Sequence, residues 1–124
     1  MPKSEPPRNV SCHCGAIRFE VHGELTGLLE CNCSTCRRHG FLHWKVPAES
    51  LRLTTERVRL SVYSWREISS GHHFCPVCGT PLLRTGYPDG IVSVNARCID
   101  EIDTFTLDIG RFDGRTKMRP GVLR

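Results

Sequence analysis

Hydrophobic and polar residues alternate along several short stretches of the chain. In residues 16–25, Ile17, Phe19 and Val21 lie on one side of an extended backbone, and charged or polar residues separate them. A period of two predicts a β-strand with one buried face. Alternation or a short apolar run predicts strands in five further segments, which are residues 43–46, 51–54, 57–65, 90–99 and 103–112.

The expected buried faces of the last three segments follow from the same alternation. They are, in chain order, Val58, Leu60 and Val62; Val92, Val94, Ala96 and Cys98; and Phe105, Leu107 and Ile109. Glycine and proline separate the segments, with a turn around Pro47. Helical periodicity is scarce, and the best helical stretch is one turn at residues 34–40, where we expect Ser34 to cap the start and Gly40 the end. The pattern predicts a mainly β domain of about six to eight short strands.

Length and composition fit one small soluble domain. The chain has 124 residues, of which 39% are hydrophobic and 24% are charged, as is usual for a globular protein with one modest core. Residues 1–9 are polar and proline-rich, and we expect them to form a flexible N-terminal arm before a single zinc-binding domain at residues 10–124. No apolar run is long enough to cross a membrane, and the N-terminus lacks the apolar centre of a secretory signal. We therefore expect a cytoplasmic protein.

The eight cysteines carry the strongest chemical signal. Seven of them are clustered, as Cys12-x-Cys14, Cys31-x-Cys33-x-x-Cys36 and Cys75-x-x-Cys78, and Cys98 stands apart. A disulfide between thiols one or two residues apart would close a strained loop, whereas zinc, whose bonds to sulfur are about 2.3 Å long, needs thiolates that converge in this way. In a reducing compartment this spacing favours metal binding over disulfides.

Two of the clusters predict a closed, structural zinc site. Cys14 and Cys78 are each followed by glycine, which can adopt a positive φ and turn backbone N–H groups towards the sulfurs. Cys12, Cys14, Cys75 and Cys78 are therefore expected to bind one ion together. Such an ion would close a long loop and so favour the folded state.

The remaining trio, Cys31, Cys33 and Cys36, has no adjacent fourth cysteine. Three protein ligands with one open position are typical of catalytic zinc, so we expect the catalytic centre here. If Cys98 supplied a fourth ligand, both sites would be closed and structural. Against this alternative, Cys98 falls on an apolar strand face, where cysteine is commonly a small buried residue. An iron–sulfur cluster is a further alternative, although the spacing differs from the common ferredoxin motifs.

Basic residues and histidines accompany the trio in the sequence. Arg37 and Arg38 can offset the charge of the thiolates and bind the carboxylates of a substrate. His39 can donate a hydrogen bond or move a proton beside the open metal position. The other histidines near the cysteines are expected to lie close to the metals without binding them, and these are His43, His72 and His73.

Two other function classes compete with an enzyme. One is a non-catalytic zinc module that contacts protein or nucleic acid through basic residues, which are Arg37, Arg38, Arg115, Lys117 and Arg119. The net charge of +4 is weak support for it, because zinc–thiolate centres add negative charge and no aromatic nucleic-acid motif accompanies the basic residues. The other is a thiol or metal carrier that uses the same open site without turnover.

Four stretches together carry a family resemblance: "SCHCGAIRFEV", "CNCSTCRRHG", "SGHHFCPVCGTPLLR" and "VNARCID". From about residue 10 to residue 110, the chain resembles the glutathione-dependent formaldehyde-activating enzyme family, which includes the centromere protein V type. The resemblance implies a mainly β fold similar to the β-tent architecture. It also implies structural zinc at Cys12, Cys14, Cys75 and Cys78, and a second, catalytic zinc at Cys31, Cys33 and Cys36.

The family activity joins glutathione and formaldehyde into S-hydroxymethylglutathione, and its reverse is a carbon–sulfur lyase reaction. Zinc suits this chemistry because it deprotonates a bound thiol and polarises a carbonyl oxygen. The resemblance therefore implies a small thiol such as glutathione as the partner. From their charge and position, and not from the resemblance, we expect Arg37 and Arg38 to bind its carboxylates beside His39. Membership does not define the substrate, and other thiol adducts or small carbonyl compounds also fit.

Overall fold

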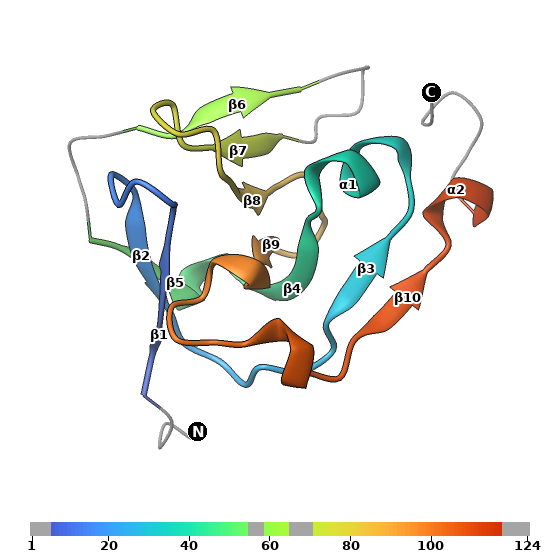
Figure 1. Ribbon diagram of the computed structural model, residues 1–124, viewed down its shortest axis with the longest axis horizontal. Helices are drawn as coiled ribbons and strands as arrows, with labels where there is room; N and C mark the ends of the chain where they lie inside the picture. Colours follow the sequence, from blue (N-terminus) through green and yellow to red (C-terminus); the bar gives the residue numbers. More distant parts are fainter. Residues whose placement is uncertain (1–5, 55–58, 65–70, 118–124) are drawn as a thin grey trace.

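The computed structural model describes residues 6–54, 59–64 and 71–117, and these residues form two β-sheets with a few short helical turns (Figure 1). The smaller sheet has the order β1-β2-β5, with β1 at Arg8–Ser11, β2 at Arg18–Val21 and β5 at Leu51–Leu53. The larger sheet has the order β10-β3-β4-β9-β8-β7-β6. Its strands, in chain order, are β3 at Leu29–Cys31, β4 at Leu42–Pro47, β6 at Ser61–Tyr63, β7 at His72–Phe74, β8 at Pro81–Arg84, β9 at Ile91–Asn95 and β10 at Gly110–Phe112.

The mainly β prediction is confirmed, and β2 follows the predicted alternation. Ile17, Phe19 and Val21 are buried, and the strand pairs with both β1 and β5 in antiparallel register. β1 begins at Arg8, so the arm predicted for residues 1–9 is too long at its C-terminal end: Arg8 and Asn9 pair with β2.

The larger sheet is centred on β4 and β9, which pair antiparallel from His43 opposite Asn95 to Pro47 opposite Ile91. At one edge, β10 runs parallel to β3 and places Phe112 beside Cys31. Figure 1 shows these two strands side by side, although about eighty residues separate them in the sequence. The late part of the chain therefore lies against the strand that ends at Cys31.

The core lies between the two sheets and is built around Trp44, which is 1% exposed. The indole N–H of Trp44 donates to the carbonyl oxygen of Glu24 at 3.1 Å, so burial leaves that polar group satisfied. Asn95 is also buried, and its amide joins three backbone groups. Its Oδ1 accepts from the N–H groups of Leu42 and Arg97, and its Nδ2 donates to the carbonyl of Pro81.

Two predicted strands are shorter than expected because a side chain caps a turn. In residues 103–112 only β10 is a strand, and Phe105 is 93% exposed on a 3₁₀ turn at Thr104–Thr106. The carboxylate of Asp103 accepts from the N–H of Phe105 and starts this turn. Asn95 similarly caps a 3₁₀ turn at Ala96–Cys98, so these residues do not continue the face of β9.

The prediction for residues 57–65 is partly wrong. β6 covers only Ser61–Tyr63, and Val62 is 53% exposed, contrary to the predicted buried face. Leu60 packs against the core as expected, whereas Val58 and Trp65 lie outside the described residues.

The helical turn at residues 34–40 is confirmed as α1, Ser34–His39. Gly40 ends it with φ 64°, as expected, but Cys33 and not Ser34 occupies the N-cap position. A second short helix, α2, spans Gly114–Lys117. None of the helices in the described part of the chain has the length and apolar composition needed to cross a bilayer.

Candidate metal centre and active site

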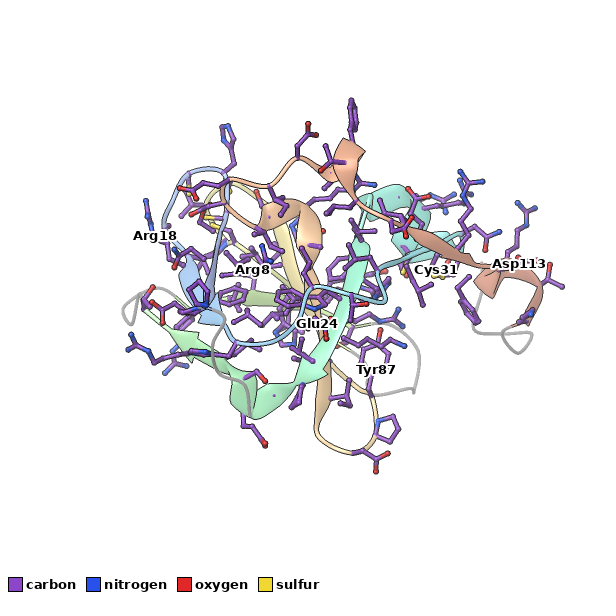
Figure 2. The ribbon with its side chains drawn as sticks, turned by 90° about the horizontal axis from the view of Figure 1, so that it is seen from below. Arg8, Arg18, Glu24, Cys31, Tyr87 and Asp113 are labelled. Atoms are coloured by element: carbon purple, nitrogen blue, oxygen red, sulfur yellow. The ribbon has the colours of Figure 1, made fainter. Side chains whose placement is uncertain are left out.

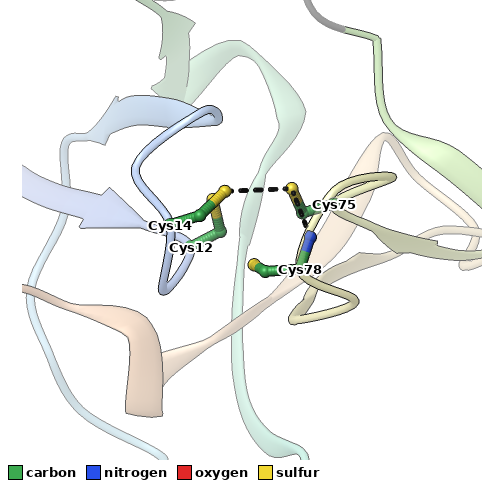
Figure 3. Close-up of side chains that lie close together, drawn as sticks. All are labelled: Cys12, Cys14, Cys75 and Cys78. Atoms are coloured by element: carbon green, nitrogen blue, oxygen red, sulfur yellow. Dashed lines mark hydrogen bonds between the residues drawn. The ribbon is translucent and has the colours of Figure 1, made fainter.

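Two turns from distant parts of the chain bring four cysteines together (Figure 3). Cys12 and Cys14 follow β1, and Cys75 and Cys78 lie between β7 and β8. The Sγ atoms of Cys12 and Cys14 are 3.7 Å apart and those of Cys14 and Cys75 are 3.8 Å apart. Four sulfurs placed tetrahedrally at about 2.3 Å from a zinc ion lie about 3.8 Å from one another. The quartet therefore has the spacing of a closed four-thiolate zinc site.

The two turns have the same construction. Gly15 and Gly79 both adopt a positive φ, 84° and 83°, which a residue with a side chain rarely adopts. Backbone N–H groups point at the sulfurs: Ile17 donates to Cys12, while Val77 and Cys78 donate to Cys75. These donors offset the negative charge that gathers when four thiols ionise.

Hydrogen bonds also stabilise the ionised form of the exposed Cys78 thiol. The Thr80 hydroxyl lies 3.1 Å from its sulfur. This hydrogen bond, together with backbone N–H groups, lowers the pKa of Cys78 to about 5. A thiol with this pKa is mostly ionised at neutral pH and is ready to bind a metal.

The second cluster contains Cys31, Cys33 and Cys36, whose sulfurs all lie within 4.8 Å of one another. Cys31 ends β3, Cys33 caps α1, and Cys36 lies inside that helix, so one short connection positions all three. Hydrogen bonds from the thiols of Cys31 and Cys36 lower the pKa of Cys33, and the same sharing raises the pKa of Cys36. Three clustered thiols are a soft donor set that suits zinc.

Cys36 also contacts two residues from neighbouring strands. The Nε2 atom of His43 lies 3.1 Å from its sulfur, and Nη1 of Arg84 lies 3.6 Å away. The other ring nitrogen of His43 is 2.7 Å from the Ser93 hydroxyl. Burial, with the positive charges of Arg84 and Lys45, lowers the pKa of His43 to about 4. The neutral imidazole has one N–H donor and one acceptor nitrogen, and its two nitrogens face the Cys36 sulfur and the Ser93 hydroxyl, which fixes the ring between them.

Cys98 does not complete the trio, so that alternative is wrong. Among the described residues, which include all eight cysteines, neither metal-type cluster contains it. Its thiol lies 3.6 Å from the Pro81 carbonyl. Burial, helped by the charges of Cys12 and Cys78, raises the pKa of Cys98 to about 12. Cys98 is thus a protonated thiol on the quartet's side of the molecule.

Two cavities meet at the trio. The larger, about 560 Å³, is lined by Cys31 and Cys36 together with Arg37, Arg97 and Arg111. The smaller, about 190 Å³, is lined by Cys31, His43, Lys45, Arg84 and Tyr87. Cys31 and Phe112 line both cavities.

Figure 2 shows where this site lies. Cys31 and Asp113, at the ends of β3 and β10, lie on one side of the view, and Arg18 lies on the opposite side. Arg18 donates to the carbonyl of Gly15 in the turn that holds Cys12 and Cys14. The trio and the quartet therefore occupy different ends of the molecule.

The three predicted substrate-binding residues divide between two faces of α1. Arg37 lines the larger cavity beside the trio. Arg38 donates to the Ser34 carbonyl and, with His39, lines a third cavity of about 500 Å³ that contains none of the clustered cysteines. The structure thus brings Arg37, but not Arg38 or His39, to a cavity that the trio lines.

The sequence analysis missed Lys45, Arg84, Tyr87 and Ser93. They come from β4, β8, the following loop and β9, and only strand pairing brings them together. The one local signal was a charged residue at the end of the apolar strand β8.

The basic residues of the alternative interaction surface that the structure describes lie on two short helices, with Arg37 and Arg38 on α1. Arg115 and Lys117 lie on α2, and Arg119 lies outside the described residues. Arg97 and Arg111 both pair with Glu30, at 3.3 and 3.6 Å.

Comparisons with known proteins agree with this architecture. The fold is similar to the crystal structure of a Rhodobacter sphaeroides protein, a structural genomics target, with a TM-score of 0.75 and 24% sequence identity over 84% of this chain and 99% of that chain. Residues 7–120 match the sequence model of the family described as "Glutathione-dependent formaldehyde-activating enzyme". The matched region includes all the clustered cysteines. The chain therefore belongs to the glutathione-dependent formaldehyde-activating enzyme family.

Proposed function

We propose that this protein is a zinc-dependent carbon–sulfur lyase-type enzyme that joins a small thiol, such as glutathione, to an aldehyde or splits the adduct. The observation that carries the proposal is the position of the trio: three sulfurs gather without a fourth cysteine at the meeting point of two cavities. Family membership supports glutathione and formaldehyde as the reference pair. The abundance of free thiols fits a reducing, cytoplasmic setting.

The two cysteine clusters would hold zinc in different roles. The quartet would bind a structural ion that joins the turn after β1 to the turn before β8. Cys31, Cys33 and Cys36 would hold the second ion and leave one position open for substrate. Zinc bound there would supply deprotonation of a coordinated thiol and polarisation of a carbonyl oxygen.

The larger cavity suits the thiol. Its volume of about 560 Å³ falls in the range of roughly 300–1,000 Å³ that holds small-molecule ligands. Glutathione carries carboxylates and an ammonium group, and this cavity offers Arg37, Arg97 and Arg111 to the former and acidic Glu30 and Asp113 to the latter. The thiol end would then reach Cys31, where the two cavities meet. Arg38 and His39 line the other face of α1, and we assign them no contact with the thiol.

The smaller cavity suits the carbonyl compound. Burial raises the pKa of the Tyr87 phenol, so that it keeps its proton and can donate a hydrogen bond to the carbonyl oxygen. His43, oriented by Ser93, holds Cys36 through Nε2. In the forward reaction the sulfur–carbon bond forms, the carbonyl π bond breaks, and the proton lost by the thiol is balanced by one gained at the new hydroxyl oxygen.

The test uses protein loaded with cobalt in place of zinc, and with zinc for turnover. We expect two metal ions per chain, a change in the cobalt–thiolate absorption when glutathione is added, and faster exchange between glutathione, formaldehyde and their adduct by NMR. Cys31→Ser should abolish the spectral change and the acceleration, while Cys98→Ser, outside both clusters, should keep them. No spectral change and no acceleration with glutathione or other small thiols would refute the proposal.

A further inference from the structure

The smaller cavity beside the trio is strongly cationic. Lys45 and Arg84 both line it and flank one ring: the Nζ of Lys45 lies 4.7 Å from the centroid of Tyr87, and the guanidinium carbon of Arg84 lies 5.7 Å from it. The ion pairs found among the described residues use Arg52, Arg97 and Arg111. Within that part of the chain, neither cation of the smaller cavity has a carboxylate oxygen within 4.0 Å.

One of these two charges has a partner in the trio, and the other does not. Arg84 donates from Nη1 to the sulfur of Cys36, while its Nε is buried without a hydrogen-bond partner. Zinc held by three thiolates carries a net charge of about −1, which Arg84 balances. Lys45 lies over the Tyr87 ring and forms no ion pair within the described residues, so its charge is left for a ligand.

The size of the cavity limits what that ligand can be. Its volume is about 190 Å³, and a water molecule takes about 30 Å³ of liquid, so the cavity holds the equivalent of about six waters. This is too small for a tripeptide and larger than formaldehyde requires. Formaldehyde also carries no charge, so it cannot neutralise the Lys45 ammonium.

We propose that the smaller cavity takes a short aldehyde that carries a carboxylate, with Lys45 binding the carboxylate and Tyr87 donating to the aldehyde oxygen. This rests on the proposed function, because the trio must present the thiol. The thiol sulfur bonds to the aldehyde carbon, the carbonyl π bond breaks, one proton is lost from sulfur and one is gained at oxygen, and the carboxylate is unchanged. No oxidant or reductant is needed.

The test measures binding of glyoxylate and of acetaldehyde, a neutral aldehyde of similar size, to the full zinc-loaded chain without thiol, by titration calorimetry. We expect glyoxylate to bind at least about tenfold more tightly, as a charge-assisted hydrogen bond predicts. Lys45→Met should weaken glyoxylate about tenfold and leave acetaldehyde unchanged, and Lys45→Arg should restore binding to within about twofold.

One control variant locates the binding. Lys117→Met makes the same substitution on α2 and should leave glyoxylate binding unchanged. Equal binding of the two aldehydes to the wild type overturns the proposal, and so does wild-type affinity for glyoxylate in Lys45→Met. If Lys45→Met does not fold, the relative affinity of the wild type for glyoxylate and acetaldehyde tests the proposal by itself.

Activity separates this proposal from the proposed function. Acceleration of the glutathione–formaldehyde reaction with no preference for glyoxylate overturns the carboxylate inference and leaves the proposed function standing. Selective, Lys45-dependent binding of glyoxylate without acceleration of thiol addition supports carboxylate binding in the smaller cavity. The same result refutes the proposed enzymatic function.

Discussion

The quartet is expected to hold the fold together, and removal of two of its exposed ligands tests this. Cys14 and Cys78 are both exposed, so changing both to serine creates no cavity in the core. One ligand then remains in each turn, Cys12 in the first and Cys75 in the second, which is too few to keep zinc bound between them. The variant thus isolates the contribution of the cross-link.

The size of the effect follows from the loop that the ion closes. Cys14 and Cys75 are 61 positions apart in the sequence, and their sulfurs are in contact. If the metal acts as a covalent cross-link would, releasing a loop of this length costs about 4 kcal/mol in free energy of unfolding at 25 °C. Small domains have only about 5–15 kcal/mol in total, so the variant should be marginally stable.

The assay is urea unfolding of the zinc-loaded proteins, followed by tryptophan fluorescence, with metal content measured in parallel. Cys31→Ser is the matched control, because the trio lies within one short connection and its ion closes no long loop. We expect the control to lose less than half as much stability as the double variant. A loss below about 1 kcal/mol in the double variant, the size of an ordinary surface substitution, would refute the reasoning. An equal loss in Cys31→Ser would show that the trio is also structural.

Three further predictions concern other residues. Asn95→Ala removes the buried amide that bonds to three backbone groups and should cost about 3 kcal/mol in urea unfolding; a change within 0.5 kcal/mol, about the size of a surface effect, would contradict this. Burial lowers the pKa of His72 to about 4, below its unfolded value of about 6.5, so its stabilising contribution is complete above about pH 6.5 and declines as pH falls towards 4. Between pH 7 and 5.5 the wild type should therefore lose more unfolding free energy than His72→Gln, by at most about 1.4 kcal/mol per pH unit; equal losses would argue against a buried neutral imidazole. Cys98→Ala should retain two zinc ions per chain by metal analysis, and a fall to one would show that the clusters were divided wrongly.

The division of the cysteines could be predicted because metal ligands are close in sequence as well as in space. Cys31, Cys33 and Cys36 lie on one connection, and each half of the quartet lies on one turn. The coordination chemistry of sulfur therefore leaves a local pattern. β2 could be predicted for a related reason, since its alternation persists over enough residues to identify the buried face.

The smaller cavity could not be predicted, because it depends on pairing between distant strands. Lys45 and Arg84 are neighbours only through β9, which pairs with both β4 and β8. β3, β7 and β10 have three residues each, too few for alternation to be distinguished from chance. At Phe105 the alternation was misleading, since the Asp103 side chain bonds to the backbone and favours a turn, whereas Leu107 and Ile109 pack against the core as predicted.

The parallel pairing of β10 with β3 has a consequence for how such enzymes diverge. Phe112 stands beside Cys31 and forms part of the wall of both cavities, yet it comes from the last part of the described chain. Substitutions in this short strand can reshape both cavities while every cysteine and its supporting turn stays the same. New substrate preferences could thus evolve through an edge strand, without any change in the two cysteine clusters.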